Sequence, residues 1–152
     1  MSTREPVDAG VRRILVATDR SETAEHAVRF AADMAVRFEA ELLLCQVVIP
    51  PAQAPPTAKE ELVEYGRRFA GDLARAVISS GEDPAQVIVD TAASENADVV
   101  VVGNVGMSGR KEFLLGNVPN RVSHNSDRTV IIVNTRQRIE QQQQKRKGLF
   151  RR

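Results

Sequence analysis

Four of the chain's nine glycines lie close together in the segment GNVGMSGRKEFLLGN, residues 103–117. The segment directly follows Asp98–Val102, a run rich in β-branched residues that predicts a buried strand. Glycine adopts positive φ angles at little steric cost and lets another group approach the backbone closely. Such a cluster at a strand end is typical either of a series of turns or of a backbone cradle whose N–H groups bind a phosphate. Arg110 and Lys111 could supply positive charge there.

A carboxylate occupies a similar position earlier in the chain. Residues 12–18, RRILVAT, predict a strand, and Asp19 follows it just before Ser21, which can cap a helix. Asp19 could contact a ligand or could cap the turn that enters the helix, and both interpretations stay open. Ligands of open α/β sheets bind outside the carboxyl ends of the strands. If the strands at 12–18 and 98–102 are neighbours, their ends share one crevice.

Two common phosphate-binding motifs do not fit the glycine spacing. The motif GxxxxGK[ST] needs a second glycine five places after Gly103, where Ser108 stands, and GxGxxG fails because two residues separate Gly103 from Gly106. The chain also shows no catalytic triad, no metal-ligand spacing and no convincing pair of carboxylates. We therefore expect no efficient enzyme.

Helical and strand patterns alternate along the whole chain. Strands are predicted at 12–18, 41–49, 73–79, 98–102 and 129–134, and helices at 21–38, from 57 to Gly71, at 83–97 and at 117–125. Thr57 and Glu60 have capping-box spacing, and Asp83 is expected to cap the third helix. The strand at 73–79 competes with a longer second helix and is preferred because a parallel sheet needs a strand there. This order predicts an α/β fold with a mostly parallel sheet covered on both faces.

Composition and charge narrow the function classes. The chain is 42% hydrophobic and 27% charged, which is ordinary for one globular domain, and no apolar run approaches the roughly 18 residues of a membrane span. Without an apolar leader and with Cys45 alone in an apolar run, we expect a cytoplasmic protein in which Cys45 is a core residue. Residues 1–135 carry a net charge of −5, which argues against a specific nucleic-acid face, and residues 136–152 carry +6. We expect that basic tail to be a solvated appendage.

The glycine spacing resembles a family motif. Gly103-x-x-Gly106, nine residues and then Gly116 resemble the G-2x-G-9x-G-(S/T) motif of ATP-binding universal stress proteins, with Asn117 where the motif has Ser or Thr. The segments ILVATDRSETAEHAVRFAADMA and NADVVVVGNVGMSGRKEFLLGNVPNRVSHNSDRTVIIVNT also resemble that family. The resemblance covers residues 12–135, which leaves 1–11 as an N-terminal extension and 136–152 as the tail.

The resemblance implies a Rossmann-like, three-layer fold of the adenine nucleotide alpha hydrolase type. Its five-stranded parallel sheet would have the order 3-2-1-4-5, with helices on both faces. It further implies ATP or another adenine nucleotide, with Mg²⁺, and a homodimer paired through the last strand. The implied function is a nucleotide-sensing stress-response module with an unknown protein partner and at most slow ATP hydrolysis. A nucleotide-independent interaction module and an enzyme for adenylyl or phosphoryl transfer are the alternatives.

The same resemblance assigns roles to eleven residues. Asp19 would be a polar partner of the ribose or base, with Ala17 and Thr18 beside it, and Val47 would line the adenine pocket. The ribose and phosphates would meet the backbone of Val102, Gly103, Asn104 and Gly106. The phosphates would be covered by Gly116, Asn117 and Val118.

Overall fold

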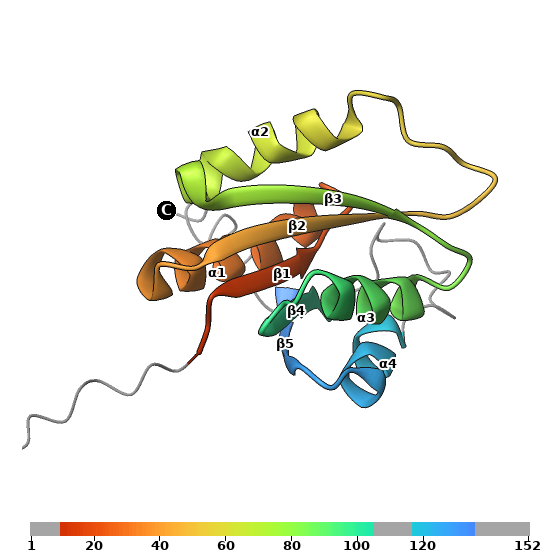
Figure 1. Cartoon of the computed structure of the whole chain (residues 1–152). Coiled ribbons are helices and arrows are strands. Elements are labelled where there is room, and N and C mark those ends of the chain that lie inside the picture. The colour runs from red at the N-terminus through yellow and green to blue at the C-terminus, as the bar shows by residue number, and fades with distance from the viewer. Residues whose placement is uncertain (1–9, 105–116, 136–152) are drawn as a thin grey trace, which may run out of the picture.

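The computed structural model of the chain describes residues 10–104 and 117–135 (Figure 1). The strands are β1 (Arg13–Ala17), β2 (Glu41–Val48), β3 (Ala74–Ser80), β4 (Val99–Gly103) and β5 (Thr129–Val133). The helices are α1 (Glu22–Phe38), α2 (Ala58–Ala70), α3 (Pro84–Ser94) and α4 (Val118–Asn125), with a 3₁₀ turn at Gly71–Leu73. The predicted alternation of strands and helices is confirmed.

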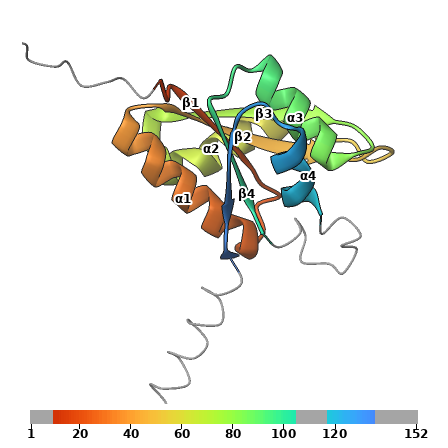
Figure 2. The ribbon, with the colours of Figure 1, turned by 90° about the horizontal axis from the view of Figure 1, so that it is seen from below.

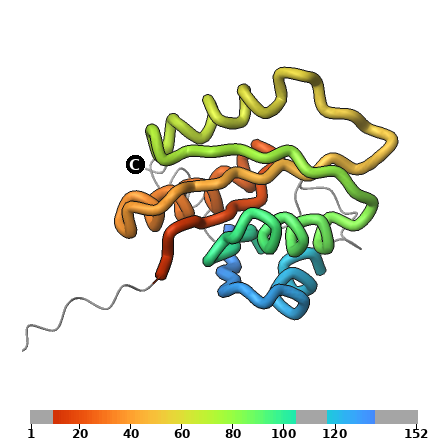
Figure 3. Tube along the Cα trace, viewed as in Figure 1, coloured from red at the N-terminus to blue at the C-terminus, as the bar shows by residue number. Residues whose placement is uncertain are grey.

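All five strands form one parallel sheet in the order β3-β2-β1-β4-β5, which confirms the implied topology. The chain starts in the middle of the sheet, moves outward through β2 and β3, and then crosses back to β4 beside β1 (Figure 3). Helices α1 and α2 cover one face, and α3 and α4 cover the other (Figure 2). Parallel strands covered on both faces favour apolar side chains at successive positions, which explains the runs Leu42–Cys45 in β2 and Val99–Val102 in β4.

Two apolar clusters make the core, one on each face of the sheet. Alternate residues of β1 separate between them: Ile14 and Val16 pack under α1 and α2, whereas Leu15 and Ala17 pack under α3 and α4. The side chains that fill both clusters are almost entirely aliphatic, and Ile14, Leu15 and Val16 are fully buried. A rigid pair of layers therefore fixes the ends of the central strands.

Polar contacts at the amino edge of the sheet help to set the register. Oδ2 of Asp98 accepts hydrogen bonds from the backbone N–H groups of Arg12 and Arg13, at 2.8 and 3.0 Å. Nε of Arg13 donates to Oε2 of Glu41 at 2.9 Å. These contacts tie the starts of β1, β2 and β4 together. Because the β1–β4 pairs run in register from Ile14 with Val99 to Val16 with Val101, the carboxyl ends of both strands lie level.

The second helix ends where the glycine pattern predicted. Gly71 adopts φ 56° and ψ −134°, a conformation that residues with a side chain rarely adopt, and its N–H donates to the carbonyl of Arg67. The chain then turns directly into β3. The preference for a strand near 73–79 over a longer helix is confirmed.

Two predicted details of the helix ends are wrong. The capping box of Thr57 and Glu60 does not form, because Thr57 has helical rather than extended dihedral angles and its hydroxyl donates to Glu61 Oε1 instead. Asp83 is the N-cap residue of α3, as predicted, although its side chain makes no regular capping hydrogen bond. Helix α3 also stops at Ser94 rather than at 97, since Asn96 takes a left-handed φ of 53°.

In the parts of the chain that the structure describes, no helix is both long enough and apolar enough to cross a membrane.

Candidate functional site

The carboxyl end of β1 passes into a tight polar turn before α1. Thr18 is fully buried; its N–H donates to the carbonyl of Cys45 at 2.9 Å, and its Oγ1 accepts from the N–H of Arg20 at 2.9 Å. Arg20 takes a left-handed φ of 62°, which turns the chain away from the sheet edge. The turn is thus held by side-chain bonds on both sides and presents Asp19 at the edge.

The two oxygens of Asp19 have different surroundings. Oδ1 accepts from the N–H of Ser21 at 2.9 Å, which confirms that Asp19 caps the local turn. Ser21 in turn caps α1, as predicted, because its Oγ accepts from the N–H of Ala24 at 3.1 Å. Oδ2 has no hydrogen-bond partner among residues 10–104 and 117–135. Because Asp19 is half-buried, its Oδ2 can accept a hydrogen bond from a ligand.

The carboxyl end of β4 lies beside this turn. Val102 is buried, and Gly103, half-buried, pairs with Val133 at the last position of the β4–β5 ladder. Val16, the residue before the last of β1, pairs with Val101 of β4 in the register. The sheet order thus brings Asp19 and Gly103 to one edge between neighbouring strands (Figure 1). The strands β1 and β4 are thus neighbours, which meets the condition that the sequence analysis set for a shared crevice.

Asn104 uses most of its polar groups within the protein. Its N–H donates to the carbonyl of Val133 at 2.9 Å, and its side-chain amide donates to Asn134 Oδ1 at 3.1 Å. Its Oδ1 accepts from both the N–H and the hydroxyl of Thr135, each at 3.0 Å. Asn104 therefore fastens the ends of β4 and β5 together, a role that the sequence pattern did not indicate because the partners lie some thirty residues away.

Four of the predicted site residues share one apolar cluster. Ala17, Val102 and Val118 are buried members of the core beneath α3 and α4, and half-buried Val47 packs against it. The carboxyl ends of β1, β2 and β4 and the first turn of α4 thus contribute side chains to one apolar cluster. These four residues are called the apolar floor below.

Helix α4 begins at this floor. Its first residues Val118 and Pro119 are buried, whereas Asn117 is exposed and makes no capping hydrogen bond with its side chain. The N–H of Arg121 donates to the carbonyl of Asn117 at 2.7 Å and closes the first turn. Gly106 and Gly116 lie outside the described residues, as do Arg110 and Lys111.

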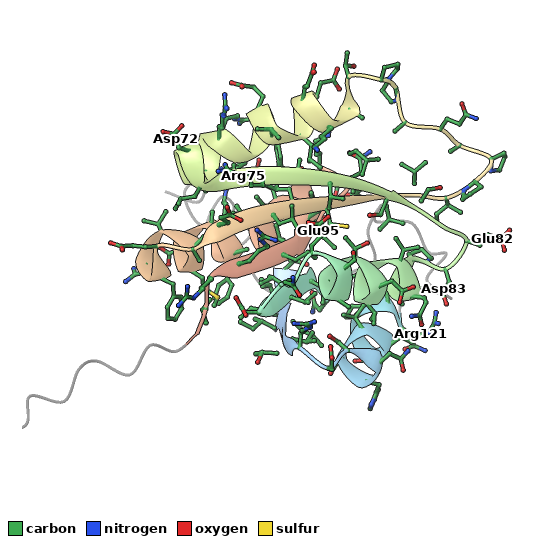
Figure 4. All side chains as sticks on the ribbon, in the orientation of Figure 1. Asp72, Arg75, Glu82, Asp83, Glu95 and Arg121 are labelled. Carbon is green, nitrogen blue, oxygen red and sulfur yellow. The ribbon has the colours of Figure 1, made fainter. Side chains whose placement is uncertain are left out.

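An ion pair that the sequence did not predict joins α4 to the start of α3. The guanidinium of Arg121 donates to both carboxylate oxygens of Asp83, with NH1 2.8 Å from Oδ1 and NH2 in contact with Oδ2 (Figure 4). These hydrogen bonds lower the pKa of the Asp83 carboxyl, and the nearby amides of Gln86 and Ala85 lower it further without forming a regular cap. The pair is therefore fully ionised at neutral pH.

Cys45 behaves as a core residue, as expected. It is fully buried between the sheet and α3, and burial raises the pKa of its thiol to about 11, with the hydroxyls of Ser79 and Thr91 offsetting part of the rise. Thr91 Oγ1 donates to Ser79 Oγ at 2.9 Å in the same place. A thiol held protonated and away from solvent is a poor nucleophile.

No group of three or more His, Cys, Asp or Glu side chains suited to a metal ion occurs in residues 10–104 and 117–135. Within that part, the acidic group at the site is Asp19 alone. A hard cation such as Mg²⁺ would need most of its oxygen ligands from a bound phosphate chain and from water.

Comparison with known proteins gives a consistent picture. Residues 10–134 match the model of the universal stress protein family. A universal stress protein of Methanocaldococcus jannaschii is 29% identical over 138 residues, covering 80% of this chain and 81% of the relative. One of Methanothermobacter thermautotrophicus is 32% identical over 143 residues, covering 82% and 96%. Among solved structures, a universal stress protein in complex with cAMP is 28% identical, with a TM-score of 0.65, over 82% of this chain and 97% of that one.

Proposed function

Because the chain belongs to the universal stress protein family, we propose that it binds an adenine nucleotide, ATP in particular, where the carboxyl ends of β1 and β4 meet. The observation that carries the proposal is the adjacency of these two ends, one followed by Asp19 and the other ending in Gly103. A related universal stress protein, similar in sequence and fold, has been solved with cAMP, which supports an adenine nucleotide as ligand.

The adenine and the ribose would contact residues that the structure describes. The adenine would lie on the apolar floor of Ala17, Val47 and Val102, where burial of its flat face is favourable. Oδ2 of Asp19, which has no partner among the described residues, would accept a hydrogen bond from a ribose hydroxyl or from the base amine. Thr18, which is buried in the turn, would contribute by holding Asp19 in place.

The phosphates would lie toward the glycine segment and α4. Gly103 and Gly106 would offer backbone N–H groups, and Gly116, Asn117 and Val118 would cover the phosphate chain from the other side. The N–H of Asn104 already binds Val133, so Asn104 would act by holding Gly103 in position rather than by donating to a phosphate. Mg²⁺ would be held mainly by phosphate oxygens and water.

The bound nucleotide would act as a signal in a stress-response module of the cytoplasm. We expect a homodimer paired through β5, because β5 lies at an edge of the described sheet and an edge strand can pair with a strand of a second chain. Ile132 on that strand is 40% exposed, which adds apolar surface at the same edge. Nucleotide occupancy would then be read by a protein partner. In residues 10–104 and 117–135 the site offers no nucleophile with an adjacent base, and we expect ATP turnover to be slow at most.

A direct test is to denature the purified protein and separate the released small molecules by chromatography. Near-stoichiometric ATP would support the proposal, and cAMP or AMP in its place would keep the site and change its ligand. Titration of nucleotide-free protein with ATP and Mg²⁺, with GTP as the matched control, measures the selectivity for the base. If no nucleotide is released and ATP with Mg²⁺ gives no binding heat, the alternative is favoured, which is a nucleotide-independent interaction module of the same fold.

A further inference from the structure

The first turn of α4 has little to hold it from within. The helix is only eight residues long, and the side chain of Asn117 makes no capping bond. Isolated helices of this length are not stable in water, so their position depends on tertiary contacts. Within the described residues, these contacts include the burial of Val118, Pro119 and Val122 and the ion pair of Arg121 with Asp83.

Arg121 links the first turn of α4 to the start of α3. Its backbone N–H binds the carbonyl of Asn117 at 2.7 Å, and its side chain reaches Asp83 at the start of α3. Figure 4 shows the Asp83 and Arg121 side chains pointing toward each other across the gap between the two helices. The two parallel hydrogen bonds fix the distance and the rotation of the guanidinium, which a single contact would not.

Asp83 makes this contact in addition to weaker local ones. Its carboxylate stands at the cap position of α3, where the amides of Gln86 and Ala85 lower its pKa, but it forms no regular capping hydrogen bond. It also reaches a residue 38 positions further along the chain. The pair is 41–44% exposed, so its contribution to global stability is small, whereas its effect on the placement of α4 is direct.

We propose that Asp83 is a positioning residue for the phosphate end of the nucleotide: through Arg121 it holds the start of α4, and with it Asn117 and Val118, over the phosphates. This rests on the proposed function. Asp83 itself would not touch the ligand. Loss of the pair would leave the adenine contacts unchanged and would make the phosphate contacts less often available, which lowers apparent affinity by the fraction of competent molecules.

The experiment compares ATP and adenosine binding by calorimetry in wild type, Asp83→Asn, Arg121→Gln and the double variant. We expect each variant to bind ATP about threefold to tenfold more weakly and adenosine equally well. The double variant should be no weaker than the weaker single variant, and Asp83→Glu should restore most of the loss. Asp33→Asn, which removes the exposed Asp33–Arg37 pair on α1, is the matched control and should bind like wild type.

Hydrogen exchange of the nucleotide-free protein tests the same link without a ligand. Asp83→Asn should speed exchange in residues 118–125 and leave α1 unchanged. The inference is overturned if Asp83→Asn binds ATP like wild type, if ATP and adenosine weaken together, or if Arg121→Gln is far weaker than Asp83→Asn, since the guanidinium would then act on the phosphates directly. A wild-type protein that binds no nucleotide would refute the proposed function itself, whereas unaffected variants of a binding protein would refute this inference only.

Discussion

Oδ1 of Asp19 accepts a hydrogen bond from the backbone N–H of Ser21 at 2.9 Å. The two residues form a turn at the carboxyl end of β1, and Ser21 then caps α1. The same carboxylate can therefore serve the fold with one oxygen and a ligand with the other. Because the turn fixes the side chain before any ligand arrives, no rotamer entropy would be lost there on binding.

Replacing Asp19 by Asn separates these two roles. The amide keeps an oxygen for the N–H of Ser21, so we expect the free energy of unfolding to change by less than about 0.5 kcal/mol. Its NH₂ group replaces the free acceptor, and nucleotide affinity should fall by about tenfold or more. Asp19→Ala removes both oxygens and should also cost about 1 kcal/mol of stability. Urea unfolding measures the free energy of unfolding, and calorimetry measures the nucleotide affinity. An Asp19→Asn protein with unchanged affinity would show that Asp19 serves only the turn.

The glycine segment can be tested although it lies outside the described residues. Gly106→Val places a branched side chain where the phosphates would approach the backbone, and we expect ATP affinity to fall by more than about 1.4 kcal/mol, a tenfold loss. Gly148→Val, the same change in the basic tail, is the control and should bind normally. Equal affinities in the two folded variants, measured by calorimetry, would count against phosphate binding at this segment.

The edge strand β5 offers a test of the proposed dimer. Ile132 is 40% exposed at that edge, and Ile132→Lys would place a charge in the pairing surface, an obstacle that natural edge strands often use. We expect a dimer for wild type and a monomer for the variant in light scattering after gel filtration. Val36→Lys, at a residue 54% exposed on α1, should leave the dimer intact. A wild-type monomer, or a variant that dimerises as well as wild type, would refute pairing through β5.

Burial of Cys45 makes stability depend on pH in the alkaline range. The thiol pKa is about 11 in the folded chain against about 9 when exposed, so folding favours the protonated form. Its contribution is complete below pH 9 and is lost as the pH rises toward 11, by up to about 2–3 kcal/mol. Cys45→Val removes this titration while keeping an apolar side chain. The difference in unfolding free energy between wild type and variant should shrink over that window, and a constant difference would show that the thiol is not buried in solution.

Most of the fold could be predicted from the sequence, and less of the candidate site could. Apolar runs located four of the five strands, and the strand near 73–79 was preferred over a longer helix because parallel connectivity needs it, which β3 bears out. Sheet order was supplied by the family resemblance, because periodicity does not say which strands are neighbours. The cap at Ser21 was predictable because the N–H that it accepts from, that of Ala24, lies within one helical turn.

Most of the features that were missed depend on residues far apart in the chain. Thr57 has the spacing of a capping box, but its backbone is already helical and its hydroxyl donates to Glu61 Oε1. Asp83 lies at the cap position of its own helix as predicted, but its hydrogen bonds to Arg121 on α4 were not foreseen. The hydrogen bond from the N–H of Asn104 to the carbonyl of Val133 was likewise not foreseen. The partners of Asp83 and Asn104 lie far along the chain, so local spacing does not reveal them, whereas Thr57 differs through its own backbone conformation.

We propose that the ends of β1 and β4 together bind adenosine and its phosphates. A crystal structure of the protein with ATP and Mg²⁺ would show whether they do. We predict adenine against Val47, the ribose or base within hydrogen-bond distance of Asp19 Oδ2, and the phosphates between Gly103 and the start of α4. Nucleotide bound elsewhere on the molecule, or side chains filling the space between Asp19 and Gly103 at saturating ATP, would contradict it.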